Sequence, residues 1–123
     1  MGVARLVVAA SALSALLAAG ACGSDGEVVL VEGESAEVLS VDNAFDPKEL
    51  TVAAGTEVTF VNVGRNEHNV IPEDEDAEWR IDTEDFQPGD EATYRFTEPG
   101  TYRYYCSIHG TLDAGQNGTI VVE

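Results

Sequence analysis

Methionine occurs only once in the 123-residue sequence, at Met1, so a folded domain that begins further along the chain has no thioether side chain. Basic residues are also scarce, with 6 Lys and Arg against 23 Asp and Glu and a formal net charge of −17. This excess of negative charge argues against nucleic acid and anionic lipid headgroups as partners, because both would be repelled. The acidity either solvates the surface or attracts a cationic partner.

Cysteine and histidine are nearly as scarce, with Cys22, Cys106, His68 and His109 as the complete set. Cys22 falls in an N-terminal segment with the pattern of an export leader, so a soft-metal site in the folded domain would use Cys106 and both histidines. One thiolate and two imidazoles are the ligand set of mononuclear copper electron-transfer sites. Such sites usually have a weak axial methionine, and here the axial donor would have to be an oxygen or be absent.

The leader pattern consists of Arg5 followed by an apolar run, Leu6 to Ala19, that is short for a membrane span. We therefore interpret residues 1–21 as a signal peptide. The interpretation predicts an extracytoplasmic protein, in a periplasm or at a cell surface.

The end of the leader, Ala19-Gly20-Ala21-Cys22, resembles the lipobox of bacterial lipoproteins. The resemblance implies that a lipid on Cys22 anchors the protein to a membrane and that residues 22–35 form a lipid-anchored tether. Two alternatives stay open: an ordinary secretory leader, and a disulfide between Cys22 and Cys106.

The remainder of the sequence has strand signals and no stretch of helical period, which predicts an all-β domain over residues 36–123. Short segments recur at intervals of roughly ten residues between Gly and Pro turns, as is typical of a β-sandwich. The expected strands, including a possible first one in the tether, are Val28–Val31, residues 36–42, Leu50–Ala53, Thr56–Val63, Glu91–Thr97, Thr101–Cys106 and Thr119–Val122. The acidic segment between His68 and Gln87 is predicted to be a surface loop with Trp79 packed beneath it.

Alternation along the strand that ends at Cys106 predicts which way its side chains face. Period two places Tyr104 and Cys106 on one face, toward the core, and Tyr105 on the other. His109 is expected to lie in the loop after this strand, and His68 follows a different strand. The folded sandwich would therefore hold the three ligands in place without metal.

Several motifs spread over the domain strengthen this interpretation when they are taken together. They are Phe45-Asp46-Pro47 with Leu50-Thr51-Val52, Gly55 to Asn62, His68-Asn69-Val70, Pro99 to Tyr102, Tyr105 to Gly110 and Gly118 to Val122. In combination they resemble the blue copper (cupredoxin) family, plastocyanin and its relatives in particular. The resemblance implies the cupredoxin fold, a Greek-key β-sandwich.

The resemblance also implies roles for single residues. His68, Cys106 and His109 would bind one copper ion, and Asn69 would tie the first ligand loop to the Cys loop. Tyr105 matches the tyrosine beside the cysteine, which in plastocyanin belongs to an outlying electron path.

The chain departs from the family at the axial position, where the family has Met. Gln116 matches that position best, and Gln is the axial ligand in stellacyanin-like members. The loop that begins at His109 is longer than in plastocyanin, so Asp113 is a rival ligand and a vacant axis is a third possibility.

These observations predict an exported type-1 copper protein that carries single electrons between redox partners, and not an enzyme. It is expected to be a monomer whose partners include cationic, cytochrome-like proteins that dock at the acidic loop, Glu73 to Asp85. One alternative is an extracytoplasmic protein that binds and delivers copper. Another is a metal-free β-sandwich interaction domain.

Overall fold

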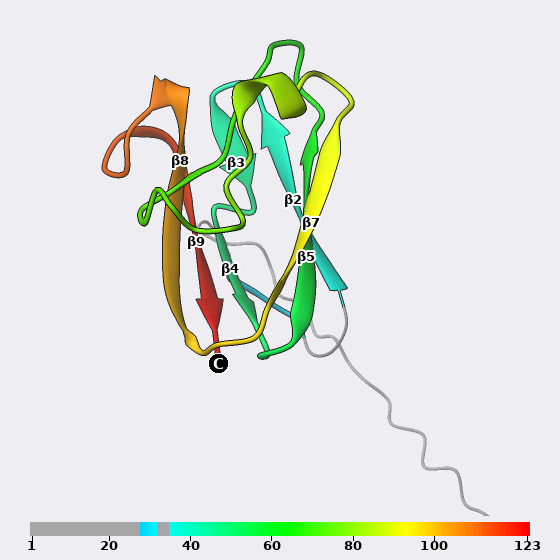
Figure 1. Cartoon of the computed structure of the whole chain (residues 1–123), viewed down its shortest axis with the longest axis vertical. Helices are drawn as coiled ribbons and strands as arrows, with labels where there is room; N and C mark the ends of the chain where they lie inside the picture. Colours follow the sequence, from blue (N-terminus) through cyan, green and yellow to red (C-terminus); the bar gives the residue numbers. More distant parts are fainter. Residues whose placement is uncertain (1–27, 32–34) are drawn as a thin grey trace, which may run out of the picture.

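The computed structural model describes residues 28–31 and 35–123, and the regular elements there are strands apart from one 3-10 turn (Figure 1). The predicted signal peptide, Cys22 and part of the predicted tether lie outside the described residues. Within the described part, no helix has the length and apolar character needed to cross a membrane. The elements are β1 (Val28–Val31), β2 (Ser35–Val41), β3 (Ala44–Asp46), β4 (Glu49–Val52), β5 (Thr56–Asn62), β6 (Ile71–Pro72), the 3-10 turn η1 (Thr83–Asp85), β7 (Glu91–Phe96), β8 (Gly100–Gly110) and β9 (Gly115–Val122).

The described strands form two sheets that face each other (Figure 1). One sheet has the order β1-β4-β9-β8-β6 and the other has the order β3-β2-β5-β7. Neighbours in a sheet are often distant in sequence: β4 pairs in parallel with β9, and β2 pairs in parallel with β5. The crossovers that these pairs require are those of a Greek-key sandwich, so the predicted fold class is confirmed.

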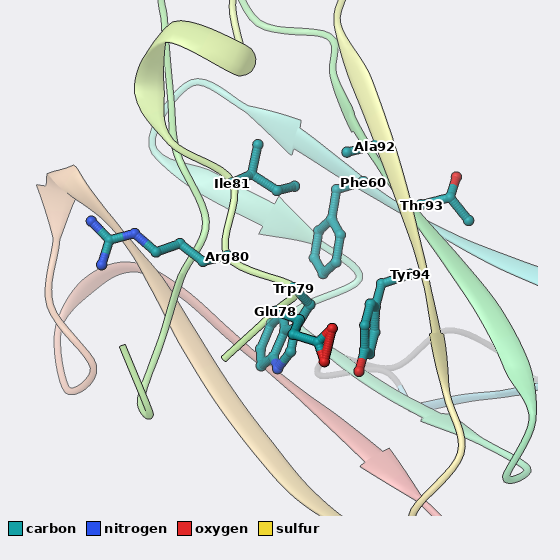
Figure 2. Close-up of a pocket in the computed structure, with 8 residues that line it drawn as sticks. All are labelled: Phe60, Glu78, Trp79, Arg80, Ile81, Ala92, Thr93 and Tyr94. Atoms are coloured by element: carbon teal, nitrogen blue, oxygen red, sulfur yellow. The ribbon is translucent and has the colours of Figure 1, made fainter. Parts of the chain in front are cut away.

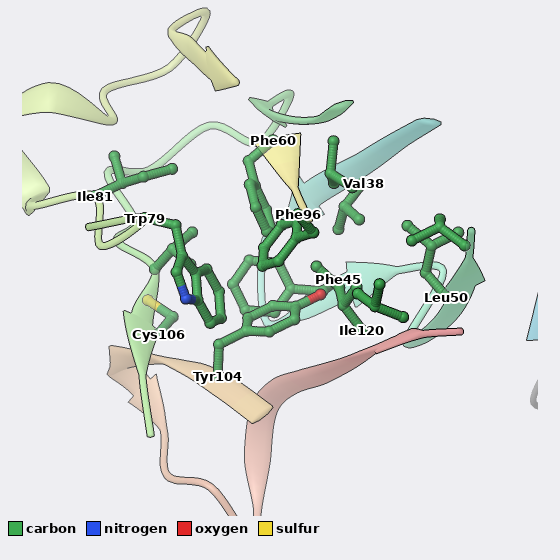
Figure 3. Close-up of a cluster of buried hydrophobic side chains, with 14 of the residues drawn as sticks. Val38, Phe45, Leu50, Phe60, Trp79, Ile81, Phe96, Tyr104, Cys106 and Ile120 are labelled. Atoms are coloured by element: carbon green, nitrogen blue, oxygen red, sulfur yellow. The ribbon is translucent and has the colours of Figure 1, made fainter. Parts of the chain in front are cut away.

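The core lies between the two sheets because their strands bury every second side chain. β5 buries Thr56, Val58, Phe60 and Asn62 and leaves the residues between them half-exposed, which is the alternation that the sequence predicted. Trp79, 7% exposed, enters the core from the acidic loop and contacts the Phe60 ring (Figure 3). The prediction that this indole packs beneath the loop is confirmed.

The structure differs from the sequence prediction at four strands, one of which is β9: it begins at Gly115 and not at Thr119, so Gln116 lies in a strand. β3 and the two-residue β6 were not expected, because each is too short to show a period. The strand that was expected to end at Cys106 continues as β8 to Gly110, so His109 lies in a strand and not in a loop. The ladder between β8 and β9 is irregular after Tyr105 and resumes where Gly110 pairs with Gly115.

Candidate metal centre

His68, Cys106 and His109 come together at one end of the sandwich. Their ligand atoms all lie within 4.8 Å of one another. The Cys106 Sγ atom is 3.7 Å from His68 Nδ1 and 3.8 Å from His109 Nδ1. Cys106 and His68 are fully buried and His109 is half-buried. Cys106 is a free thiol and belongs to the same buried core cluster as Trp79 (Figure 3).

The spacing of these atoms fits a single metal ion. Metal bonds to nitrogen and sulfur are about 2.0 and 2.3 Å long, and a trigonal arrangement then separates the two ligand atoms by roughly 3.7 Å. The two Sγ–Nδ1 distances, 3.7 and 3.8 Å, agree with that value. One thiolate with two imidazoles is also the donor set that copper electron-transfer sites use. The residues present therefore fit copper.

Asn62, at the end of β5, shapes the loop that carries His68. Its buried side chain donates to the carbonyl oxygens of Asn66 (3.0 Å) and Phe86 (2.8 Å) and accepts from the Gly64 N–H (2.9 Å). The His68 N–H also donates to Phe86 O (3.3 Å). Sequence reasoning gave Asn62 no role, although a polar residue at a core position of an alternating strand is a signal that such a bond exists.

Asn69 connects the His68 loop to β8 at Ser107, next to Cys106. Its Oδ1 accepts from the Ser107 N–H at 2.8 Å, and its Nδ2 donates to the hydroxyl oxygens of Ser107 and Thr83, both at 2.9 Å. These contacts match the tie that the family resemblance implies. Thr83 begins η1, so the same amide also fixes the end of the acidic loop next to the ligands.

Asp42 is a site residue that sequence reasoning missed. Its Oδ1 lies 3.0 Å from His68 Nε2 and accepts from the N–H groups of Arg65 (3.1 Å) and Asn66 (3.2 Å). The Arg65 N–H and the bond from His68 lower the pKa of Asp42 from 3.8 to about 2, because both favour the charged form. Asp42 stands 26 residues before His68, and only the folded turn between β2 and β3 brings the two together.

Gln116 is fully buried and its side-chain amide has one possible orientation. Its Nε2 lies 3.1 Å from Ser40 Oγ, 3.0 Å from Val41 O and 2.9 Å from Ala44 O. Carbonyl oxygens only accept hydrogen bonds, so the NH₂ group must occupy this place. The Oε1 atom is buried and has no hydrogen-bond partner among the described residues. A buried oxygen without a donor is what an additional metal ligand requires.

The side chain of Asp113, the alternative axial ligand, lies on the surface. Its side chain is 90% exposed, and its Oδ1 accepts from Arg103 Nη2 at 2.9 Å. Arg103 also donates to Leu112 O at 3.0 Å, which fixes this part of the loop from outside. The group of candidate ligands within the described chain does not include Asp113.

Two other features lie outside the ligand group. A shallow pocket beside Trp79 is lined by Phe60, Tyr94 and their neighbours, and it contains none of the three ligand candidates (Figure 2). Tyr105 is half-buried and pairs with Ile71 of β6, on the opposite face of β8 from Cys106. Its predicted orientation away from the core is consistent with this placement.

The fold and the group of one thiol and two imidazoles define a small copper protein of the cupredoxin class. Residues 29–123 match the model of the copper-binding proteins of the plastocyanin/azurin family. The chain belongs to this family of electron carriers, and its cofactor is copper.

Relatives and solved structures agree with the family assignment. The chloroplastic plastocyanin of Silene latifolia subsp. alba is 35% identical over 126 residues, covering 95% of this chain and 70% of the relative. A purple cupredoxin from Nitrosopumilus maritimus has a TM-score of 0.59 and 25% identity over 72% of this chain and 99% of its own. An amicyanin mutant in the Cu(I) form, with Gln in place of a Met, has a TM-score of 0.59 and 27% identity over 72% of this chain and 82% of its own.

Proposed function

We propose that His68, Cys106 and His109 bind one copper ion in a type-1 site and that the chain uses it to carry single electrons between redox partners. The observation that carries the proposal is the convergence of the three ligand atoms within 4.8 Å. Copper supplies the one-electron Cu(II)/Cu(I) couple when it is bound.

The surrounding chain would serve this couple by holding the ligands still. His68 and Cys106 are fully buried, and the contacts of Asn62, Asn69 and the Asp42 carboxylate fix the His68 loop and its link to β8. A fixed and water-free ligand set changes little between oxidation states, which favours fast electron exchange. His109 is half-exposed, so we infer that electrons enter and leave through its ring.

We infer that Gln116 Oε1 is the axial donor. Its orientation is set by the three acceptors around Nε2, and the oxygen on the other side has no partner within the described part of the chain. An amide oxygen is a harder donor than a thioether, and hard donors favour Cu(II). The reduction potential should therefore be low for the family.

We infer that the chain is a carrier and not an enzyme. One copper would use both histidines and Cys106, and Gln116 would cover the axis, so no coordination position is left for a substrate. Delivery of copper remains the rival function. A metal-free interaction domain conflicts with membership of a copper-binding family.

We infer that cationic redox partners dock at the acidic loop. The acidic side chains of the loop are all exposed, and they are Glu73, Asp74, Glu75, Asp76, Glu78, Asp82, Glu84 and Asp85. The Thr83 hydroxyl bonds to Asn69, which places this charge next to the ligand loops. Opposite charge would then bring a partner to the site by long-range attraction.

We also infer that the protein is exported, monomeric and attached to a membrane by a lipid on Cys22. The support is the leader pattern of residues 1–21 and the small residues before Cys22. Mass spectrometry of the protein isolated from its native membrane would identify an acylated N-terminal cysteine, and an unmodified Cys22 would contradict the anchor.

Rapid mixing distinguishes electron transfer from copper delivery. The Cu(II) protein would be mixed with a reduced basic cytochrome, and in a parallel experiment with a copper chelator of high affinity. We expect the cytochrome to be oxidised while copper stays bound through gel filtration. Loss of copper to the chelator as fast as the cytochrome is oxidised would favour delivery instead.

A further inference from the structure

Asp42 hydrogen-bonds to the ring nitrogen of His68 that faces away from the Cys106 thiol. The Asp42 Oδ1 to His68 Nε2 distance is 3.0 Å, whereas His68 Nδ1 faces Cys106 Sγ at 3.7 Å. An ionised carboxylate can only accept a hydrogen bond, so Nε2 must carry the ring proton. The lone pair of Nδ1 is then left on the side of the metal site.

The carboxylate is held in place independently of the histidine. The Arg65 N–H lies 3.1 Å from each Asp42 oxygen and the Asn66 N–H lies 3.2 Å from Oδ1. A Cβ atom at Gly64 would overlap the carboxylate and would lie 3.0 Å from His68 Nε2. The backbone of Gly64 therefore closes the space beside this hydrogen bond, and a side chain there would push the Asp42 carboxylate away from His68.

The two imidazoles differ in their outer contacts. His68 is fully buried, and its outer nitrogen bonds to a charged group. His109 is half-buried, and within the described part of the chain no group hydrogen-bonds to its Nε2. Asp42 thus hydrogen-bonds to only one of the two imidazoles.

The turn that carries Asp42 also fixes the axial candidate. Val41 O and Ala44 O accept from Gln116 Nε2, on either side of Asp42 in the sequence. Asn43, at the centre of the turn, has a positive φ of 73°, a conformation that Asn tolerates. One tight turn therefore holds both His68 and Gln116.

We propose that Asp42 is a positioning residue that fixes the His68 tautomer and strengthens His68 as a copper donor. A hydrogen bond to a carboxylate raises the basicity of a ligating imidazole. A stronger donor with a nearby negative charge stabilises Cu(II) relative to Cu(I), so Asp42 lowers the reduction potential. The inference rests on the proposed copper site, and it adds a residue outside the four ligand candidates.

The first test compares reduction potentials of two variants that each remove one negative charge. Asp42→Asn keeps an oxygen acceptor for the Arg65 and Asn66 N–H groups and for His68, so the loop geometry should survive. Glu67→Gln is the matched control, because the Glu67 carboxylate is exposed on the rim beside His109 and, within the described residues, accepts from Gln87 Nε2 (3.4 Å) and not from the His68 ring. We expect Asp42→Asn to raise the potential by at least three times the shift of Glu67→Gln. A smaller ratio would overturn the proposal.

The second test needs no copper. Nitrogen-15 NMR of the copper-free wild type should show His68 with its proton on Nε2, and Asp42→Ala should lose that fixed tautomer. A proton on Nδ1 in the wild type, or an unchanged tautomer in Asp42→Ala, would overturn the role of Asp42. A copper-loaded wild type without a thiolate band would instead reject the copper site itself, so the two failures are distinguishable.

Discussion

Tyr104→Phe should stabilise the protein, although it removes a polar atom and adds nothing. Tyr104 is fully buried, and its hydroxyl has no hydrogen-bond partner among the described residues. Burial raises the pKa of this hydroxyl well above its usual range, so it stays protonated. A Cβ atom at Gly118 would overlap the hydroxyl, which shows that the group packs directly against backbone.

The expected gain follows from two opposing terms. A buried hydroxyl without a partner costs about 1–3 kcal/mol, and the substitution removes that cost. The missing oxygen leaves a gap of about 15 Å³, which costs about 0.4 kcal/mol at roughly 24 cal/mol per Å³. We therefore expect the free energy of unfolding of Tyr104→Phe to rise by about 0.6–2.6 kcal/mol.

Urea denaturation of the copper-free proteins measures this difference, because removing the metal removes its own contribution to stability. Tyr102→Phe is the matched control, since the Tyr102 hydroxyl donates to Glu98 O at 2.6 Å and has a partner to lose. The control should be neutral or slightly destabilised. A Tyr104→Phe protein that is less stable than wild type by 1 kcal/mol or more, on the scale of a lost hydrogen bond, would refute the reasoning.

Three further predictions concern the site. Gln116→Met should raise the reduction potential, because a thioether replaces the harder amide oxygen, while Asp113→Ala should change the potential little. Cyclic voltammetry measures both potentials. A shift in Asp113→Ala alone would assign the axial position to Asp113 instead. His109→Gly should keep copper but open a coordination position from the rim, and a visible spectrum that does not respond to added imidazole would contradict this. Electron transfer to a basic cytochrome should slow as the salt concentration rises, because salt screens charges over a Debye length of about 10 Å at 0.1 M. Rates that do not depend on salt would mean that the acidic loop from Glu73 to Asp85 only solvates the surface.

The β-sandwich and the three ligand candidates could be predicted from the sequence because both depend on short-range patterns. Strand alternation repeats every two residues, and Cys106 and His109 are three residues apart in a recognisable motif. The position of His68 after β5 follows from the same strand pattern. The extension of β8 through His109 was missed because its pairing resumes only beyond an irregularity, at Gly110 and Gly115.

Asp42 and the acceptors of Gln116 could not be predicted, because their roles depend on long-range contacts. Asp42 meets His68 across 26 positions, and Ser40 meets Gln116 across 76. An Asp at the end of an expected strand and a Ser within that strand carry no local signal of a ligand contact. Their functions appear only when β2, β5 and β9 are folded together.

Addition of Cu(II) to the purified protein, followed by visible and EPR spectra, tests the central claim most directly. We expect one copper per chain at the site of His68, Cys106 and His109, an intense visible band from thiolate-to-copper charge transfer that depends on Cys106, and a type-1 EPR signal. Cys106→Ser should lose the visible band. A wild type that binds copper without this band, or a Cys106→Ser variant that keeps it, would contradict the assignment of the site.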